Sequence, residues 1–248
     1  MVKKHIFVST LILSLFLGIS CICCSRLSNK INNTTTLTKH KNTTTPVEEK
    51  YYDSVAIVQT MPGTKGFAPK LATGFAIDPN HILTVGHFCL DVAFEQTLYR
   101  ASKKIMTLKS DEKGLLKPAI ISTILAFDEK KDICLMSSPG HGMTPLPLAE
   151  TIAPLTVEDR ITIIGAPHGF FPIRRDGRII SSLAYRFAPY DDMLFLAVNI
   201  QKGSSGSPVI KDGSVIGMIA VVPFHVDETA LAVPIDDIRK FLEKNMIK

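Results

Sequence analysis

Ser205 lies in the segment GSSGSP, residues 203–208, where glycines and a proline predict a tight turn. A serine hydroxyl is a weak nucleophile unless a base within hydrogen-bond distance takes its proton, and that base needs a third group to orient it. A turn can present such a nucleophile, but an ordinary Ser/Gly turn has the same composition. The choice between the two depends on whether the chain also supplies a base and an orienting group.

A histidine and an aspartate elsewhere in the chain fit these two roles. His87 directly follows the strand-like run ILTVG, whose end would hold the ring in place. Asp132 opens the apolar run DICLM after a charged loop, and Asp128 within that loop is its rival. The backbone N–H groups of Gly203 and Ser205 are suited to bind the oxyanion of a tetrahedral intermediate. Together these residues predict nucleophilic attack on a carbonyl group.

The elements that must position these residues are mostly short strands. Runs such as SVAIVQTM, ATGFAID, RITIIGA and SVIGMIAVV are rich in β-branched residues and are separated by Gly, Pro, Asp and Lys. Helical periodicity appears only in PIDDIRKFLEKNM, where Ile235, Ile238, Phe241 and Leu242 fall on one face. Many short strands followed by one helix predict an all-β fold, and about 200 residues is enough for two small barrels that share an interface.

Three blocks, LTVGHFC, DICLM and GSSGSP, resemble in this order the signature segments of chymotrypsin-fold serine proteases. That fold orders its triad His, Asp, Ser, unlike subtilisins and α/β-hydrolases. Four more segments are similar to those of the bacterial high-temperature-requirement branch: LATGFAID, IIGAPHGFFPIRRDGRIIS, GSVIGMIA and ALAVPIDDIRKFL. The resemblance covers about residues 50–245. It implies two six-stranded antiparallel β-barrels with a C-terminal helix.

The same resemblance implies a serine endopeptidase that acts on polypeptides. His87 would be the base, Asp132 its orienting group and Ser205 the nucleophile, with Gly203 and Ser205 forming the oxyanion hole. No metal or cofactor is expected, because the histidines of the chain form no pair with metal-ligand spacing.

Several positions depart from the family pattern. Ser207 stands where a glycine is usual, and Gly86 where an alanine is usual. Ser204 replaces the aspartate with which digestive members bind their new N-terminus, so activation by that route is not expected. The chain ends directly after the predicted helix, so no PDZ domain is expected. Thr73, in LATGFAID, stands where the related strand would have a glycine. Ser207 and Thr73 keep open a second interpretation, a catalytically silent binding or adhesion module on the same fold.

The N-terminal part predicts export. Two lysines precede an uncharged run over residues 6–24, so residues 1–24 form either a cleaved signal peptide or a retained membrane anchor. The sequence LGISC is similar to a bacterial lipoprotein signal, with Cys21 as the lipidated residue. Residues 25–49 are rich in Asn, Thr and Lys and predict a disordered tether. The protease domain then spans residues 50–248, either secreted or tethered to the membrane at the cell surface.

The net charge of +5 comes from the N-terminal part and not from the predicted domain. Residues 1–45 contain six basic and no acidic residues, which leaves 22 basic and 23 acidic residues in the rest. A nearly neutral domain is not typical of nucleic-acid binding, so no nucleic-acid partner is expected.

Two further features concern bonding and specificity. Cys89 and Cys134 each lie two residues after a predicted triad member, and both a disulfide and two buried thiols are compatible with the sequence. The resemblance places Asn199 at the floor of the specificity pocket and Ala220 and Val222 on its wall. An amide cannot neutralise a buried cation, which predicts cleavage after small or medium uncharged residues such as Ala, Val or Thr.

Overall fold

The computed structural model describes residues 51–60, 69–99, 104–110, 116–152, 154–187, 190–221 and 228–246. The predicted signal or anchor with Cys21, the predicted tether and Val222 lie outside the described residues. Within them, no helix is both long and apolar enough to cross a membrane.

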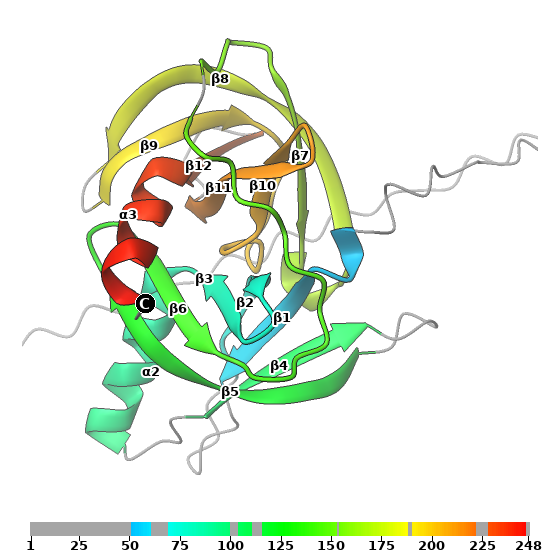
Figure 1. Ribbon diagram of the computed structural model, residues 1–248, viewed down its shortest axis with the longest axis vertical. Helices are drawn as coiled ribbons and strands as arrows, with labels where there is room; N and C mark the ends of the chain where they lie inside the picture. The colour runs from blue at the N-terminus through cyan, green and yellow to red at the C-terminus, as the bar shows by residue number, and fades with distance from the viewer. Residues whose placement is uncertain are drawn as a thin grey trace, which may run out of the picture. The chain divides into compact units, whose positions relative to one another are not determined.

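Six antiparallel strands close the first barrel in the order β1-β2-β3-β6-β5-β4 (Figure 1). They are β1 (Val55–Thr60), β2 (Leu71–Asp78), β3 (His81–Thr84), β4 (Lys104–Ser110), β5 (Leu116–Asp128) and β6 (Ile133–Ser137). The pairing of β3 with β6 sets Thr84 opposite Cys134. This register brings the segment before His87 next to the segment after Asp132.

Six more antiparallel strands close the second barrel in the order β10-β11-β12-β9-β8-β7. They are β7 (Arg160–Gly165), β8 (Ile173–Phe187), β9 (Tyr190–Ala197), β10 (Pro208–Lys211), β11 (Ser214–Val221) and β12 (Thr229–Pro234). A short 3-10 helix, η1 (Pro167–Gly169), follows β7. The two closed barrels confirm the all-β, chymotrypsin-like fold predicted from the sequence.

The C-terminal helix α3 (Ile235–Asn245) is also confirmed. Ile235, Ile238, Phe241 and Leu242 are its buried residues, as the periodicity predicted. The helix packs on β11 and β12, and it also contacts β6 of the first barrel. An ion pair of 3.0 Å between Lys131 Nζ and Asp237 Oδ2 ties the turn before β6 to this helix.

A second helix, α2 (Gly86–Tyr99), was not predicted. It begins just after the end of β3, so His87 lies in its first turn. Over residues 86–93, where the burial of its side chains is described, Phe88, Cys89 and Val92 are the buried hydrophobic residues, and this three-to-four spacing is that of a helix face. Other apolar residues are spread through the whole segment, so its sequence shows no single helical face.

One hydrophobic cluster runs through both barrels. It contains Phe75 and Leu135 of the first barrel together with Met218 and Val233 of the second. A smaller cluster that includes Ile163 fills the interior of the second barrel. The continuous core joins β2, the start of α2 and β10.

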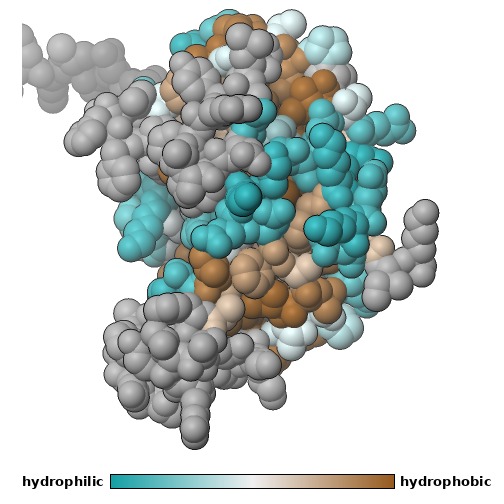
Figure 2. All heavy atoms as spheres, turned by 90° about the vertical axis from the view of Figure 1, so that its left-hand side faces the viewer, coloured by the Kyte–Doolittle hydropathy of each residue, from teal (hydrophilic) through white to brown (hydrophobic). Residues whose placement is uncertain are grey.

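The outer face of β5 remains apolar. Ile121, Leu125 and Phe127 are exposed, whereas Ser122 between them is buried, which is the period-two alternation of a strand. Figure 2 shows hydrophobic surface over the first barrel, in the lower half of the view. The described residues leave this strip of β5 uncovered.

Candidate functional site

The structure brings His87 and Asp132 into direct contact. Nδ1 of His87 lies 3.0 Å from Oδ1 and 3.1 Å from Oδ2 of Asp132, and the backbone N–H of His87 donates to Oδ1 at 2.7 Å. The Asp132 side chain is fully buried, whereas that of His87 is 40% exposed. The carboxylate therefore orients the ring through Nδ1 and leaves Nε2 free to meet a second partner.

The turn before β6 explains why Asp132, and not Asp128, makes this contact. Asp128 Oδ1 accepts the backbone N–H groups of Lys130 and Lys131, so that carboxylate closes the turn itself. Asp132 follows with a φ of +54°, a left-handed conformation that aspartate tolerates better than most residues. Strain of this kind is found at functional sites, where the surrounding structure holds it.

Gly86 permits the close approach of the two segments. A Cβ atom at this position would lie 2.6 Å from the carbonyl oxygen of Asp128 and 2.9 Å from the backbone nitrogen of Ile133. An alanine would have to push the Asp132 turn away from His87. The glycine in place of the usual alanine is thus matched to the close packing of this turn.

A disulfide joins the same two segments. Cys89 in α2 and Cys134 in β6 are bonded, with their Cα atoms 6.3 Å apart, and both are fully buried. Of the two alternatives that the sequence left open, the structure contains the disulfide. A covalent link therefore lies two residues after each member of the His87–Asp132 pair.

Ser205 lies in the turn that the sequence predicted. Gly203 and Gly206 have φ values of +100° and +86°, which favour glycine, and a Cβ at Gly206 would overlap the carbonyl oxygen of Thr73. The Ser205 hydroxyl is partly buried and donates to the carbonyl oxygen of Ala220 at 3.2 Å. His87, Gly203 and Ser205 line one cavity of about 500 Å³. The structure thus brings the predicted base and nucleophile to the same cavity.

Three of the five backbone amides from Gly203 to Ser207 donate a hydrogen bond to a backbone carbonyl. The N–H of Ser204 donates to Gln201 O, that of Gly206 to Ile219 O and that of Ser207 to Ser204 O. Among the described residues, the N–H groups of Gly203 and Ser205 have no hydrogen-bond partner. These are the two amides predicted to form the oxyanion hole.

His168 fixes the direction of one of these amides. Its backbone N–H donates to Lys202 O at 2.7 Å. Because the C=O and N–H of a trans peptide point in opposite directions, this bond turns the N–H of Gly203 away from His168. His168 itself has a φ of +52°, and it lines the cavity together with Lys202. Nothing in the sequence indicated this backbone contact.

Comparison with known families identifies the chain. The family model for the trypsin-like peptidase domain matches residues 72–218. The chain belongs to the trypsin-like peptidase family. Its matched segment includes His87, Asp132 and Ser205.

Solved structures share the fold of this trypsin-like peptidase. The active form of the Rv3671c protease from M. tuberculosis aligns with a TM-score of 0.66 and 20% identity, over 82% of this chain and 85% of that one. Deg5 aligns with a TM-score of 0.62 and 20% identity, over 78% of this chain and 89% of that one. Compared with curated protein sequences, the chain has no significant match.

The residues predicted to line the specificity pocket of this peptidase are separated in the structure. Ala220 is buried and its carbonyl oxygen bonds to Ser205, so it lies at the site. Asn199 is exposed and does not line the cavity of Ser205. It lines a cavity of about 830 Å³ on the second barrel, and a much smaller one next to Ser204. Asn199, six residues before Ser205, therefore does not reach the cavity that His87 and Ser205 line.

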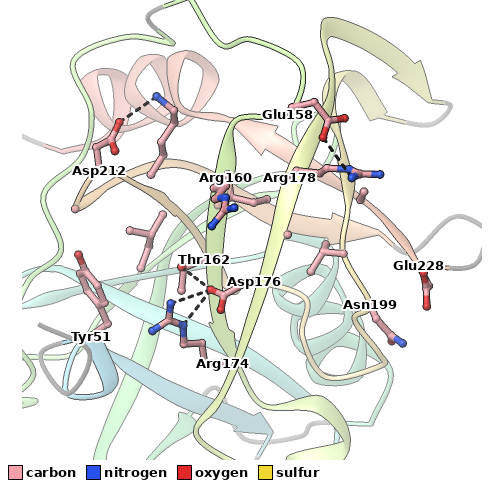
Figure 3. Close-up of a pocket in the computed structure, with 17 residues that line it drawn as sticks. Tyr51, Glu158, Arg160, Thr162, Arg174, Asp176, Arg178, Asn199, Asp212 and Glu228 are labelled. Atoms are coloured by element: carbon pink, nitrogen blue, oxygen red, sulfur yellow. Dashed lines mark hydrogen bonds and ion pairs between the residues drawn. The ribbon is translucent and has the colours of Figure 1, made fainter. Parts of the chain in front are cut away.

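The 830 Å³ cavity is lined by several charged residues, most of which are paired (Figure 3). Arg178 pairs with Glu158, Arg174 pairs with Asp176, and Lys211 pairs with Asp212. The hydrogen bond that the Lys211 ammonium donates to Asp212 raises the pKa of Lys211 above its ordinary value. Four basic and four acidic side chains line this cavity, so its formal charges balance.

Proposed function

We propose that this trypsin-like peptidase is an exported serine endopeptidase with Ser205 as nucleophile, His87 as general base and Asp132 as the group that orients His87. The observation that carries the proposal is the arrangement around one cavity. His87 and Ser205 line it, and the buried carboxylate of Asp132 bonds to Nδ1 of the ring. Membership of a peptidase family makes polypeptides the substrate class.

In the proposed reaction the Ser205 hydroxyl exchanges its bond to Ala220 O for one to Nε2 of His87. Oγ then attacks the scissile carbonyl carbon while His87 takes the hydroxyl proton. Asp132 keeps the second proton on Nδ1 and stabilises the imidazolium cation. His87 next protonates the leaving amine. Water finally hydrolyses the acyl-enzyme, with His87 again as base.

The free amides of Gly203 and Ser205 are suited to stabilise the negative charge on the carbonyl oxygen. Preorganised backbone donors act on charge that develops in the transition state, and loss of one such donor typically slows an enzyme by about 10²- to 10³-fold. The bond from His168 to Lys202 O supports this role, because it holds the Gly203 peptide in one orientation.

The departures that favoured a silent module are accommodated in the structure. Ser207 is fully buried beside Gly165, and its side chain fills the space that a Cβ on Gly165 would occupy. The hydroxyl of Thr73 bonds to Gly203 O at 2.9 Å and so supports the turn. Since neither residue blocks the cavity, the peptidase is the better supported of the two functions.

Export is part of the proposal. The disulfide between Cys89 and Cys134 supports it, because structural disulfides form and persist in oxidising compartments. A signal over residues 1–24, with lipid attachment at Cys21 in a bacterial host, agrees with that compartment. Lipidation or retention of the run would tether the enzyme to a membrane.

Hydrolysis of an unfolded protein and of a peptide library tests the proposed activity. We expect the wild type to cleave both, and Ser205→Ala and His87→Ala each to lose nearly all turnover, because triad members act as a unit. Ser204→Ala, which removes a neighbouring hydroxyl, is the matched control and should remain active. Near-normal turnover of His87→Ala would show that the triad is wrongly assigned.

A further inference from the structure

Thr73 on β2 is joined to the turn around Ser205 by two hydrogen bonds. Its N–H donates to Ser205 O at 2.8 Å, and its hydroxyl donates to Gly203 O at 2.9 Å. The hydroxyl also accepts the N–H of Ala166 at 3.0 Å, and Thr84 Oγ1 donates to Thr73 O at 2.7 Å. Thr73 is fully buried, so these groups have no access to bulk water.

Hydrogen bonds hold the backbone carbonyls of the turn that carries Ser205. Lys202 O accepts from His168, Gly203 O from the Thr73 hydroxyl, Ser204 O from Ser207, and Ser205 O from the Thr73 amide. Each carbonyl from 202 to 205 thus has a donor. The Thr73 hydroxyl is the one donor among these four that comes from a side chain.

The Thr73 hydroxyl also connects this turn to the loop over residues 166–169, which contacts Gly203. Ala166, whose N–H the hydroxyl accepts, directly precedes η1 with His168. The backbone of Gly203 packs against the same loop, because a Cβ there would lie 2.5 Å from Ala166 O. The Thr73 hydroxyl therefore holds Gly203 in two ways. It bonds directly to the Gly203 carbonyl, and through Ala166 it holds the loop whose His168 N–H bonds to Lys202 O.

Thr73 belongs to the barrel that carries the base. Its carbonyl accepts the hydroxyl of Thr84, the last residue of β3, and His87 follows three residues later. A short path of bonds thus runs from the segment before His87, through Thr73, to the carbonyls of Ser205 and Gly203. The position of the nucleophile turn relative to the base depends on this path.

We propose that Thr73 is a positioning residue of the active site, whose hydroxyl holds the Gly203 peptide so that the amides of Gly203 and Ser205 meet the oxyanion. This inference rests on the proposed function. Thr73 touches no substrate and acts through Gly203. Its loss should therefore weaken binding of the transition state and leave binding of the substrate nearly unchanged.

Thr73→Val tests the proposal, because valine has almost the same shape and lacks the hydroxyl. We expect kcat of the purified protein to fall about 10- to 100-fold with KM within about twofold, the effect of misplacing an oxyanion donor without removing it. The affinity for a peptide boronate that mimics the tetrahedral intermediate should fall by a similar factor. Thr73→Ser keeps the hydroxyl and should retain kcat within about threefold.

Thr107→Val is the matched control for the loss of a buried hydroxyl bond in the same barrel. The hydroxyl of Thr107 bonds to Ser122 Oγ at 2.8 Å, both side chains are fully buried, and neither lines the cavity. This variant should unfold at a lower temperature but keep kcat. If Thr73→Val does not fold, Thr73→Ala provides a second side chain without a hydroxyl for the same comparison.

Three outcomes would overturn the proposal. A folded Thr73→Val with unchanged kcat would show that the hydroxyl has no role in positioning. A loss in Thr73→Ser as large as in Thr73→Val would assign the effect to packing of the methyl group. An inactive wild type would overturn the proposed function and this inference with it. Only that last outcome removes activity from the wild type, which separates the two failures.

Discussion

Ser207 and Gly165 share one side-chain space between the nucleophile turn and the end of β7: a Cβ built on Gly165 would overlap the hydroxyl oxygen of Ser207. Ser207 is fully buried, and its hydroxyl has no hydrogen-bond partner among the described residues. The serine that replaces the family's usual glycine is thus sterically accommodated, but its polar group is buried unpaired.

The first prediction follows from that unpaired hydroxyl. Ser207→Ala keeps the Cβ and removes a buried polar group, so the free energy of unfolding should rise by about 1 kcal/mol. The melting temperature should rise by about 2–4 °C, with activity unchanged. The control is Ser138→Ala, which removes a buried hydroxyl that is bonded to Ser122 and should lower the melting temperature. A lower melting temperature for Ser207→Ala would contradict the account.

Gly86→Ala should damage both stability and activity. The new Cβ would lie 2.6 Å from Asp128 O, so the turn that carries Asp132 must move away from His87. Overpacking of this kind costs about 1–3 kcal/mol. Thermal unfolding and kcat check both effects.

Gly140→Ala is the control for loss of a glycine elsewhere. Gly140 has a positive φ, but no heavy atom lies within 4 Å of the place that a Cβ would take, so this variant should lose stability and keep kcat. If Gly86→Ala kept full turnover, close packing at this turn would not matter for the His87–Asp132 contact.

Reduction should destabilise the protein. The Cys89–Cys134 bond closes a long loop, and such a bond typically stabilises a fold by about 2–4 kcal/mol. A reductant should therefore lower the melting temperature of the wild type and leave that of a Cys89→Ala/Cys134→Ala double variant unchanged. Alkylation mapped by mass spectrometry should label these two cysteines only after reduction. Full labelling of both in the unreduced, unfolded chain would show that they are free thiols.

The prediction of export concerns the mature N-terminus. Residues 1–24 should direct the chain out of the cytoplasm, and in a bacterial host Cys21 should carry lipid. Mass spectrometry of the N-terminal peptide distinguishes a lipidated Cys21, another cleavage site and a retained anchor. An unprocessed chain beginning at Met1 in the cytoplasm would contradict export.

Local patterns in the sequence were sufficient for the strands, for α3 and for the residues that meet at the cavity. Ile235 and Phe241 are buried because apolar spacing encodes the face of a helix, and Asp132 was separated from Asp128 by the apolar strand that follows it. The role of Thr73 had no such signal, since its hydroxyl meets a carbonyl 130 residues away. Asn199 was assigned to the specificity pocket by its distance in sequence from Ser205. That distance does not determine where an exposed side chain before a turn points.

The central claim is that His87 activates Ser205 as a nucleophile, and a fluorophosphonate tests it most directly because it reacts with an activated serine. After reaction of the purified wild type, we expect mass spectrometry to locate a single adduct on Ser205. Ser205→Ala should not react, His87→Ala should react far more slowly, and Ser204→Ala should react like the wild type. An unreactive wild type, an adduct on another serine, or a His87→Ala variant that reacts at the wild-type rate would contradict the claim.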